Sequence, residues 1–540
     1  MIKFRVLFAV AATALISACA SSAPPLAATS VGRIRSDVAF LADDARMGRE
    51  AGTAGYDEAA GYVAKRMKQS GLKPASRAGW RQEVPLRSSE RDLGAARLSF
   101  SVGAEEAILV HLEDFIIGRT YNDETFSMEA PLVYAGYGVS APEEGVDDYA
   151  GVDAAGKIVV VFSGAPPALN TEKRAHYSSG EVKLETAAAH GAVGFISMPS
   201  KKDADETKWT RAVNGVSTAG MTFIESDGRA HVAAPSIKAS ANLSAAGAEK
   251  LFAGERLDYT ALQAKEAEGK GAPAGFNLTK TGSLSGGSVL ADARSANIIG
   301  MIEGSDPALK NEVILLTAHL DHIGISKSAK PGEDAINNGA LDNSGGVAVL
   351  LETASRFARA GTRPRRTIAF AAVTAEEKGL IGSDYLARNP AFGGKRVVAN
   401  VNLDMPIALY PFTDVIAFGA ERSSIGAVVA EAAKSMGVAL SPDPIPEENI
   451  FVRSDHYSFV KQGAPAVFLV PGFANGGAEA FGAFLKKHYH KPSDDLSLPI
   501  DYDALARFSD LNYRIARGLA NAPVAPDWAV GDFFGTKFAR

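Results

Sequence analysis

Histidine and carboxylate side chains recur in five short segments in the second half of this 540-residue chain. Imidazole nitrogens and carboxylate oxygens are ligands that Zn²⁺ takes in proteins. Two adjacent carboxylates can also divide the tasks of holding a metal and moving a proton. The pattern therefore predicts a zinc site. The segments are His319-Leu320-Asp321-His322, Leu341-Asp342-Asn343, Glu376-Glu377, Leu403-Asp404 and Tyr489-His490.

The elements that precede these segments predict how they are positioned. Apolar runs at 313–317, 367–373 and 397–403 are typical of strands buried on both faces, and they alternate with helical stretches such as 346–360. This alternation predicts an α/β fold. In such folds, sites form beyond the carboxyl ends of the strands, which is where His319 and Asp404 stand.

Each residue also has a structural explanation when it is taken singly. Asp342 stands where a helix N-cap is expected, Glu376-Glu377 suits a solvated helix start, and His319 suits a hydrogen-bonded core histidine. The occurrence of all these groups at element ends in one α/β region favours the metal site over these separate explanations.

The order of the motifs HLDHIG, LDNSGG, AEEKGLIGS, NLDM and YHKPSDD resembles that of the co-catalytic zinc peptidases. That group includes bacterial secreted leucine-type aminopeptidases, glutamate carboxypeptidase and the non-catalytic transferrin receptor. The resemblance implies a mixed central sheet flanked by helices and two Zn²⁺ ions. It further implies the ligand roles: His319 and Asp404 on one ion, Glu377 and His490 on the other, and Asp342 bridging both.

The resemblance and the chemistry together predict three further roles. Glu376 is expected to be the general base, because a carboxylate next to a ligand lies close to the reacting water without binding the metal. Asp321 is expected to accept the second N–H of the His319 imidazole. Tyr489 is expected to donate a hydrogen bond to the oxyanion, with a core-anchoring tyrosine as the alternative. The resemblance also implies a cis bond between Asp342 and Asn343.

Two other histidines are expected in other roles. His322 and His456 are interpreted as pocket wall or core rather than as ligands. The segment Arg453-Ser454-Asp455-His456 also resembles a family segment near the site, but the sequence assigns it no role.

Short strand-like runs between Leu98 and Phe162 predict a separate β-rich domain. The segments VYAGYG at Val133, DDY at Asp147 and AAAHGA at Ala187 resemble the protease-associated domain inserted into many of these enzymes. Such a domain implies restricted access for large substrates, with a passive spacer as the alternative. We expect a signal peptide at 1–18, a lipidated tether at 19–30, peptidase residues at 31–125 and 289–523, the insert at 126–288 and a tail at 524–540.

The first residues predict export. Lys3 and Arg5 precede an apolar run at 6–16 that is too short to cross a bilayer, and the run ends in a segment that resembles a lipobox at Cys19. Cys19 is the only cysteine, so lipidation would leave no free thiol, although a cysteine there by chance is the alternative. Ala20 at the second mature position favours the outer membrane of the bacterial cell envelope, facing the periplasm.

The leading functional prediction is an exported aminopeptidase that acts on peptides. A carboxypeptidase or dipeptidase on the same metals, a one-zinc glutaminyl cyclase and a non-catalytic receptor-like protein are the alternatives. Retention of every ligand position argues against the receptor, but exopeptidase specificity depends on groups outside these motifs. The net charge of −6 and the lack of a basic stripe argue against nucleic acid as a partner.

Overall fold

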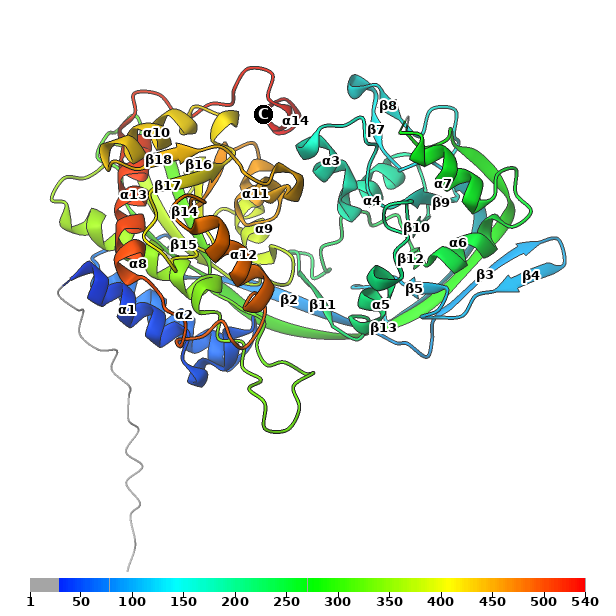
Figure 1. Cartoon of the computed structure of the whole chain (residues 1–540), viewed down its shortest axis with the longest axis horizontal. Helices are drawn as coiled ribbons and strands as arrows, with labels where there is room; N and C mark the ends of the chain where they lie inside the picture. Colours follow the sequence, from blue (N-terminus) through cyan, green and yellow to red (C-terminus); the bar gives the residue numbers. More distant parts are fainter. Residues whose placement is uncertain (1–28, 77, 270, 540) are drawn as a thin grey trace, which may run out of the picture.

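The computed structural model describes residues 29–539 except Arg77 and Lys270. The predicted signal peptide and nearly all of the predicted tether, Cys19 included, lie outside the described residues. The chain forms two lobes, which the long strands β2 (Arg81–Arg91) and β13 (Phe276–Ile302) connect (Figure 1). Within the described part of the chain, no helix has the length and apolar character needed to span a membrane.

The first lobe is built on one mixed sheet. Its strands lie in the order β11-β2-β13-β15-β14-β16-β19-β17-β18, and the four strands from β15 to β19 in this order are parallel. The mixed sheet flanked by helices is as the sequence predicts. The bounds are β1 (Lys73–Pro74), β11 (Gly220–Phe223), β14 (Glu312–His319), β15 (Thr367–Val373), β16 (Arg396–Leu403), β17 (Asp414–Phe418), β18 (Ala439–Ser441) and β19 (Ala466–Pro471).

Helices cover both faces of this sheet because successive side chains of its strands point to opposite faces and are apolar on both. Ile314 and Leu316 of β14 lie in the core beneath α1, α2, α8 and α13, whereas Val313 and Leu315 face α9 and α11. All four side chains are fully buried, and each stabilises the fold by about 1.5–3 kcal/mol. The helices are α1 (Ser30–Leu41), α2 (Ala54–Gln69), α8 (Gly345–Arg359), α9 (Ile381–Arg388), α10 (Ile425–Ser435), α11 (His456–Val460), α12 (Gly477–Lys487) and α13 (Tyr502–Asn521).

The second lobe has a hydrophobic core of its own, which extends from Ala96 to Leu284. Its sheet has the order β4-β3-β13-β6-β9-β10-β12-β5 and contains parallel as well as antiparallel pairs. Residues 96–117 pack in this core, ahead of the predicted boundary at 126, because β3 pairs with β13 and β5 pairs with β12. The protease-associated assignment stays a prediction.

The second lobe also contains helices, which makes it less purely β-rich than the sequence suggests. Its strands are β3 (Arg97–Val102), β4 (Glu105–Ile108), β5 (Phe115–Ile117), β6 (Thr125–Tyr134), β7 (Ser140–Ala141), β8 (Val146–Asp147), β9 (Ile158–Phe162), β10 (Gly194–Met198) and β12 (Ala239–Leu243). Its helices are α3 (Thr171–Ser178), α4 (Gly180–Ala189), α5 (Glu206–Asn214), α6 (Ala245–Phe252) and α7 (Tyr259–Ala267).

The carboxyl-terminal residues pack between the lobes. Phe534 of α14 (Phe533–Phe538) is fully buried in the first lobe, where its ring centroid lies 5.3 Å from that of Phe451. Phe533, the next residue, faces His176 of α3 at 5.6 Å between ring centroids. The lobes therefore meet at α14 as well as along β2 and β13 (Figure 1).

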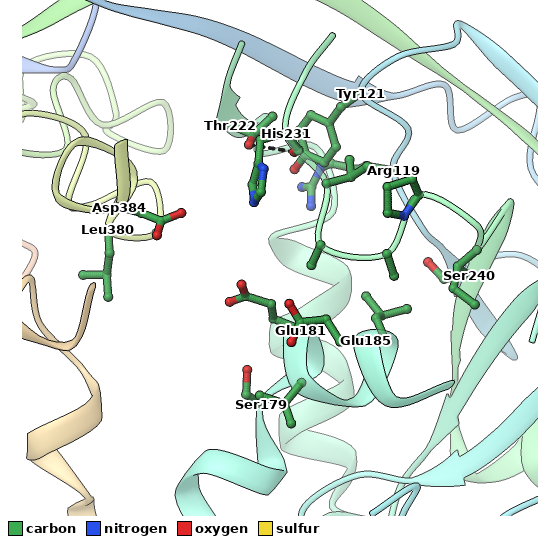
Figure 2. A pocket seen from close by; sticks show the side chains of 18 of the residues that line it. Arg119, Tyr121, Ser179, Glu181, Glu185, Thr222, His231, Ser240, Leu380 and Asp384 are labelled. Atoms are coloured by element: carbon green, nitrogen blue, oxygen red, sulfur yellow. Dashed lines mark hydrogen bonds between the residues drawn. The ribbon is translucent and has the colours of Figure 1, made fainter. Parts of the chain in front are cut away.

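A cavity of about 1100 Å³ lies between the two lobes. Glu181 and Glu185 of α4 line one wall, and Asp384 of α9 lines the wall formed by the first lobe (Figure 2). Arg119 and His231 line it as well. The lining contains none of the predicted metal ligands, so this cavity and the predicted metal site are separate features of the described structure.

Candidate active site

The predicted site residues meet at the carboxyl ends of the parallel strands. His319 is the last residue of β14, Asp404 directly follows β16, and Glu376 lies three residues after the end of β15. Asp342 lies in the short helical segment η3 (Ala340–Ser344), immediately before α8. His490 follows α12. The placement beyond the strand ends is the one predicted for an α/β sheet.

One group of potential ligands surrounds His319. Its Nε2 atom lies 3.0 Å from Oδ1 of Asp404 and 3.3 Å from Oδ1 of Asp342. The three residues are buried, and their ligand atoms all lie within 4.8 Å of one another. The three side chains predicted to share one ion are thus together.

A second group surrounds Glu377. Nε2 of His490 lies 3.0 Å from Oε2 of Glu377 and 3.5 Å from Oδ2 of Asp342. Asp342 therefore turns one carboxylate oxygen toward His319 and the other toward His490. This is the placement that a bridging ligand requires.

The backbone at Asp342 is fixed by its neighbours. The Asp342–Asn343 bond is cis, as predicted. The Asn343 side chain donates to the carbonyl of Leu403 (3.0 Å) and accepts from the Gly346 N–H (3.1 Å). A Cβ at Gly346 would collide with Asn343 and with the Leu403 carbonyl, which explains the glycine in this motif.

The site concentrates negative charge in a buried place. Burial is the largest influence on Glu376 and raises its pKa well above the usual value, with the charges of Asp404 and Glu377 adding to the effect. Burial also acts to raise the pKa of Glu377, but hydrogen bonds with His322 and His490 bring it to about 2. Asp342 likewise has its pKa held far below the usual value by His319 and His490, against the effect of burial.

These residues fit zinc by the chemistry of the donor set. Four carboxylates converge with three imidazoles, those of His319, His322 and His490, and the nitrogen and oxygen ligands that Zn²⁺ prefers are all present. Buried carboxylates in such proximity require compensating positive charge. Two divalent cations at the two groups would supply that charge.

Glu376 differs from the other carboxylates in its contacts. Its ligand atom lies within 4.8 Å of those of His319 and Glu377, but the carboxylate accepts no hydrogen bond from any described residue. The neighbouring Tyr489 ring stacks on His490 at 3.8 Å between centroids. Burial raises the pKa of Tyr489, as do nearby carboxylate charges, so its hydroxyl stays protonated.

The structure corrects the prediction for Asp321. The atom close to Nδ1 of His319 is the backbone carbonyl oxygen of Asp321, at 3.1 Å, and not its carboxylate. The carboxylate instead accepts the backbone N–H groups of Glu376 (3.1 Å) and Glu377 (3.2 Å). The physical reason is that the Asp321 carbonyl already lies at the Nδ1 position of the imidazole. The buried carboxylate is therefore left to accept the two backbone N–H groups of the turn at Glu376 and Glu377.

Several residues near the site received no role from the sequence. Ser454 donates to Oδ2 of Asp404 (2.7 Å), which gives the Arg453–His456 segment a function. Asp494 accepts the backbone N–H groups of Leu341 (2.9 Å) and Asp342 (3.0 Å). Asp494 lies in the YHKPSDD motif, and this position could have indicated from the sequence that it belongs to the site.

His322 and His456, which the sequence places in the pocket wall or the core, are both buried. Nδ1 of His322 lies 2.7 Å from Oε1 of Glu377, and His322, Asp342 and Glu377 form a further group that could hold a metal ion, so His322 stands among the potential ligands and not only in the pocket wall. Nε2 of His456 lies 2.6 Å from the carbonyl oxygen of Phe451, away from the carboxylate groups. His456 is therefore a core residue, as interpreted from the sequence.

Comparison with known proteins shows what this part of the chain is similar to. Residues 297–516 match the model of peptidase family M28. Leupeptin-inactivating enzyme 1 of Streptomyces exfoliatus is 31% identical over 269 residues, which cover 48% of this chain and 55% of that protein. A "probable glutamate carboxypeptidase" of Arabidopsis thaliana is 34% identical over 120 residues, covering 22% and 15% respectively. Leucine aminopeptidase 1 of Trichophyton rubrum is 27% identical over 223 residues, covering 40% and 55%.

The chain thus spans about half the length, or less, of these relatives. The family match covers every residue discussed above as a potential zinc ligand, together with Glu376 and Tyr489. Over residues 297–516 the chain is similar to peptidase family M28.

Proposed function

We propose that this protein is an exported, zinc-dependent aminopeptidase that removes residues from the amino termini of peptides. One observation carries the proposal: Asp342 presents its two carboxylate oxygens to two different histidines, beside a glutamate that no described residue binds. A relative named as a leucine aminopeptidase supports the substrate class.

In this proposal His319 and Asp404 would hold one zinc, Glu377 and His490 would hold the second, and Asp342 would join both. When bound, the ions supply Lewis acidity, which polarises the scissile carbonyl and makes water acidic enough to ionise near neutral pH. The residues of the chain hold the ions in place with buried oxygen and nitrogen atoms, in surroundings of low polarity.

Glu376 would move the proton. As a carboxylate without a hydrogen-bond donor among the described residues, it would accept a proton from the attacking water and pass it to the leaving amine. The protonated Tyr489 hydroxyl would donate to the oxyanion of the tetrahedral intermediate.

The type of exopeptidase is tested with blocked substrates. We expect the purified chain to release nitroaniline from aminoacyl-nitroanilides and to cleave dipeptides whose carboxyl group is blocked. It should leave dipeptides with a blocked amino group intact, because an aminopeptidase binds the free amine. The reverse preference would reassign the chain as a carboxypeptidase, and a requirement for both free termini would make it a dipeptidase.

We also propose a lipid anchor at Cys19, which lies outside the described residues. The expected mature protein begins at Cys19, carries acyl chains there and fractionates with the outer membrane of a double-membraned bacterium. Mass spectrometry of the mature amino terminus measures this directly, and a Cys19→Ala variant is the control for membrane retention. An unmodified Cys19 in a protein cleaved elsewhere would contradict the anchor and leave the peptidase proposal intact.

A further inference from the structure

Arg49 is a buried arginine outside the segment that matches the peptidase family. It ends the short helical segment η1 (Asp44–Arg49), and 1% of its surface is exposed. Its guanidinium donates only to backbone carbonyls. The four acceptors are Leu320 (3.0 Å), Leu41 (2.6 Å), Asn338 (2.5 Å) and Gly339 (3.2 Å).

Three of these four carbonyls belong to segments that carry predicted zinc ligands, and the fourth, that of Leu41, ends α1. Leu320 directly follows His319, and the Asn338–Gly339 pair leads into η3, which contains Asp342. One side chain therefore ties together the backbone on either side of the His319–Asp342 contact. No residue of the peptidase-family segment makes an equivalent set of four contacts to these carbonyls among the described residues.

The backbone around Arg49 adds two contacts to the same region. The Arg49 carbonyl accepts the His322 N–H (3.3 Å), and the Gly48 carbonyl accepts the Gly324 N–H (3.1 Å). Gly48 lies so close to Gly324 and Asn337 that a Cβ there would collide with both carbonyls. Arg49 itself adopts a left-handed conformation, with φ of 48°, which places its side chain toward the site at the expense of backbone strain.

The charge of Arg49 has no ion-pair partner within 4 Å among the described residues, so it acts on the surrounding carboxylates as a whole. The charges of Asp494 and Asp321 have the largest influence on the pKa of Arg49 among these carboxylates, followed by those of Asp342 and Glu377. Asp494 and Asp321 each use both carboxylate oxygens to hold backbone N–H groups of ligand segments.

We propose that Arg49 is a positioning residue for the metal site: its guanidinium fixes the backbone carbonyls directly after His319 and shortly before Asp342. The amino-terminal residues thereby complete a site whose ligands all lie beyond residue 318. This inference rests on the proposed zinc function. Burial lowers the pKa of Arg49 to about 10, which keeps the guanidinium charged at neutral pH.

The experiment compares zinc affinity in three purified full-length proteins: wild type, Arg49→Lys and Arg366→Lys. Lysine keeps the charge but cannot reach four carbonyls from one planar group. We expect Arg49→Lys to weaken zinc binding, measured by chelator competition, by about 10- to 100-fold, as changes behind metal ligands usually do. Cobalt-substituted protein gives a second readout, because a shifted ligand geometry changes its visible absorption.

Arg366 is the matched control. It is fully buried and also donates to backbone carbonyls, those of Leu519 and Ala522, but it precedes β15 and so lies at the opposite end of the sheet from the site. Arg366→Lys is expected to lower the thermal midpoint while zinc affinity stays at the wild-type value. An equal loss of affinity in both variants would overturn the proposal, since it would show a general effect of destabilisation.

Chemical rescue separates the positioning role from a loss of folding. In Arg49→Ala, millimolar guanidinium ion is expected to restore zinc affinity, whereas the same salt leaves wild type and Arg366→Lys unchanged. Absence of rescue together with wild-type affinity in Arg49→Lys would overturn the inference. If Arg49→Lys does not fold, failure of guanidinium to restore zinc uptake during refolding of Arg49→Ala would do the same. Wild-type protein without zinc would instead reject the proposed function, and the inference with it.

Discussion

Replacing Glu376 by glutamine is expected to lower kcat by about 10²- to 10⁴-fold and to leave the zinc content unchanged. The amide keeps the size of the side chain but cannot accept the proton from water. Because the Glu376 carboxylate is hydrogen-bonded to no described residue, the substitution breaks no contact that holds the backbone or a ligand. Steady-state kinetics with an aminoacyl-nitroanilide, together with elemental analysis of the same preparation, measures both quantities.

Glu377→Ala is the matched comparison, because the two residues are adjacent. Glu377 contacts His322 (2.7 Å) and His490 (3.0 Å), so its removal is expected to lower metal occupancy itself. Equal loss of zinc in both variants would show that our division of roles between the two glutamates is wrong. A Glu376→Gln enzyme with wild-type kcat would remove Glu376 from the mechanism altogether.

Removal of zinc is expected to abolish measurable activity and to lower the thermal midpoint of the first lobe. Zinc binds the folded chain and not the unfolded one, so free zinc at about 1,000 times its dissociation constant stabilises the fold by about 4 kcal/mol per site. The ions also offset the repulsion among the buried carboxylates Asp342, Glu376, Glu377 and Asp404. Dialysis against a chelator, followed by calorimetry and assay, measures the two effects.

Re-addition of two equivalents of zinc per chain is expected to restore activity, and magnesium at the same concentration is the control for non-specific ions. Full activity at clearly fewer than two zincs would contradict the bridging role of Asp342. An unchanged thermal midpoint after complete removal would show that the metal does not bind between the groups described here.

Three of the predicted ligands stand beside the ends of regular elements: His319 ends β14, Asp404 follows β16 and Asp342 precedes α8. The boundaries follow from local patterns: the run at 367–373 is β15 to the residue, and α8 begins one residue before the predicted helix. The order of the five motifs then brings His319, Asp342 and Asp404 to one edge of a parallel sheet. The five side chains lie close together, and their role as zinc ligands stays a prediction.

Contacts that depend on the path of the backbone could not be predicted. Whether the carbonyl or the carboxylate of Asp321 approaches His319 depends on how the chain turns after β14, and spacing alone does not fix that turn. Arg49 is more remote still, because 270 residues separate it from His319 and no pattern links the two. Its role follows from tertiary packing alone.

The boundaries of the second lobe could not be predicted from local sequence patterns either. β13 runs without interruption from Phe276 to Ile302 and belongs to both sheets, although Gly282, Gly286 and Gly287 would ordinarily suggest turns. The predicted boundary near residue 288 falls inside this strand. Pairing with β2, β3 and β6 keeps the strand continuous and overrides the glycines.

The pairing of β2 with β13 makes the two strands a β-hairpin whose connection happens to contain a whole lobe. Arg91 is opposite Ser288, and the Asp92 N–H donates to the Gly287 carbonyl at 2.9 Å, so the strand ends are already at the spacing of a tight turn. Residues 92–287, which include β11 at the edge of the first lobe's sheet as well as the second lobe, can therefore be regarded as an insertion at the tip of a hairpin. A two-residue Asn-Gly turn in their place would close the hairpin, and a different domain with closely spaced termini could be grafted at the same position.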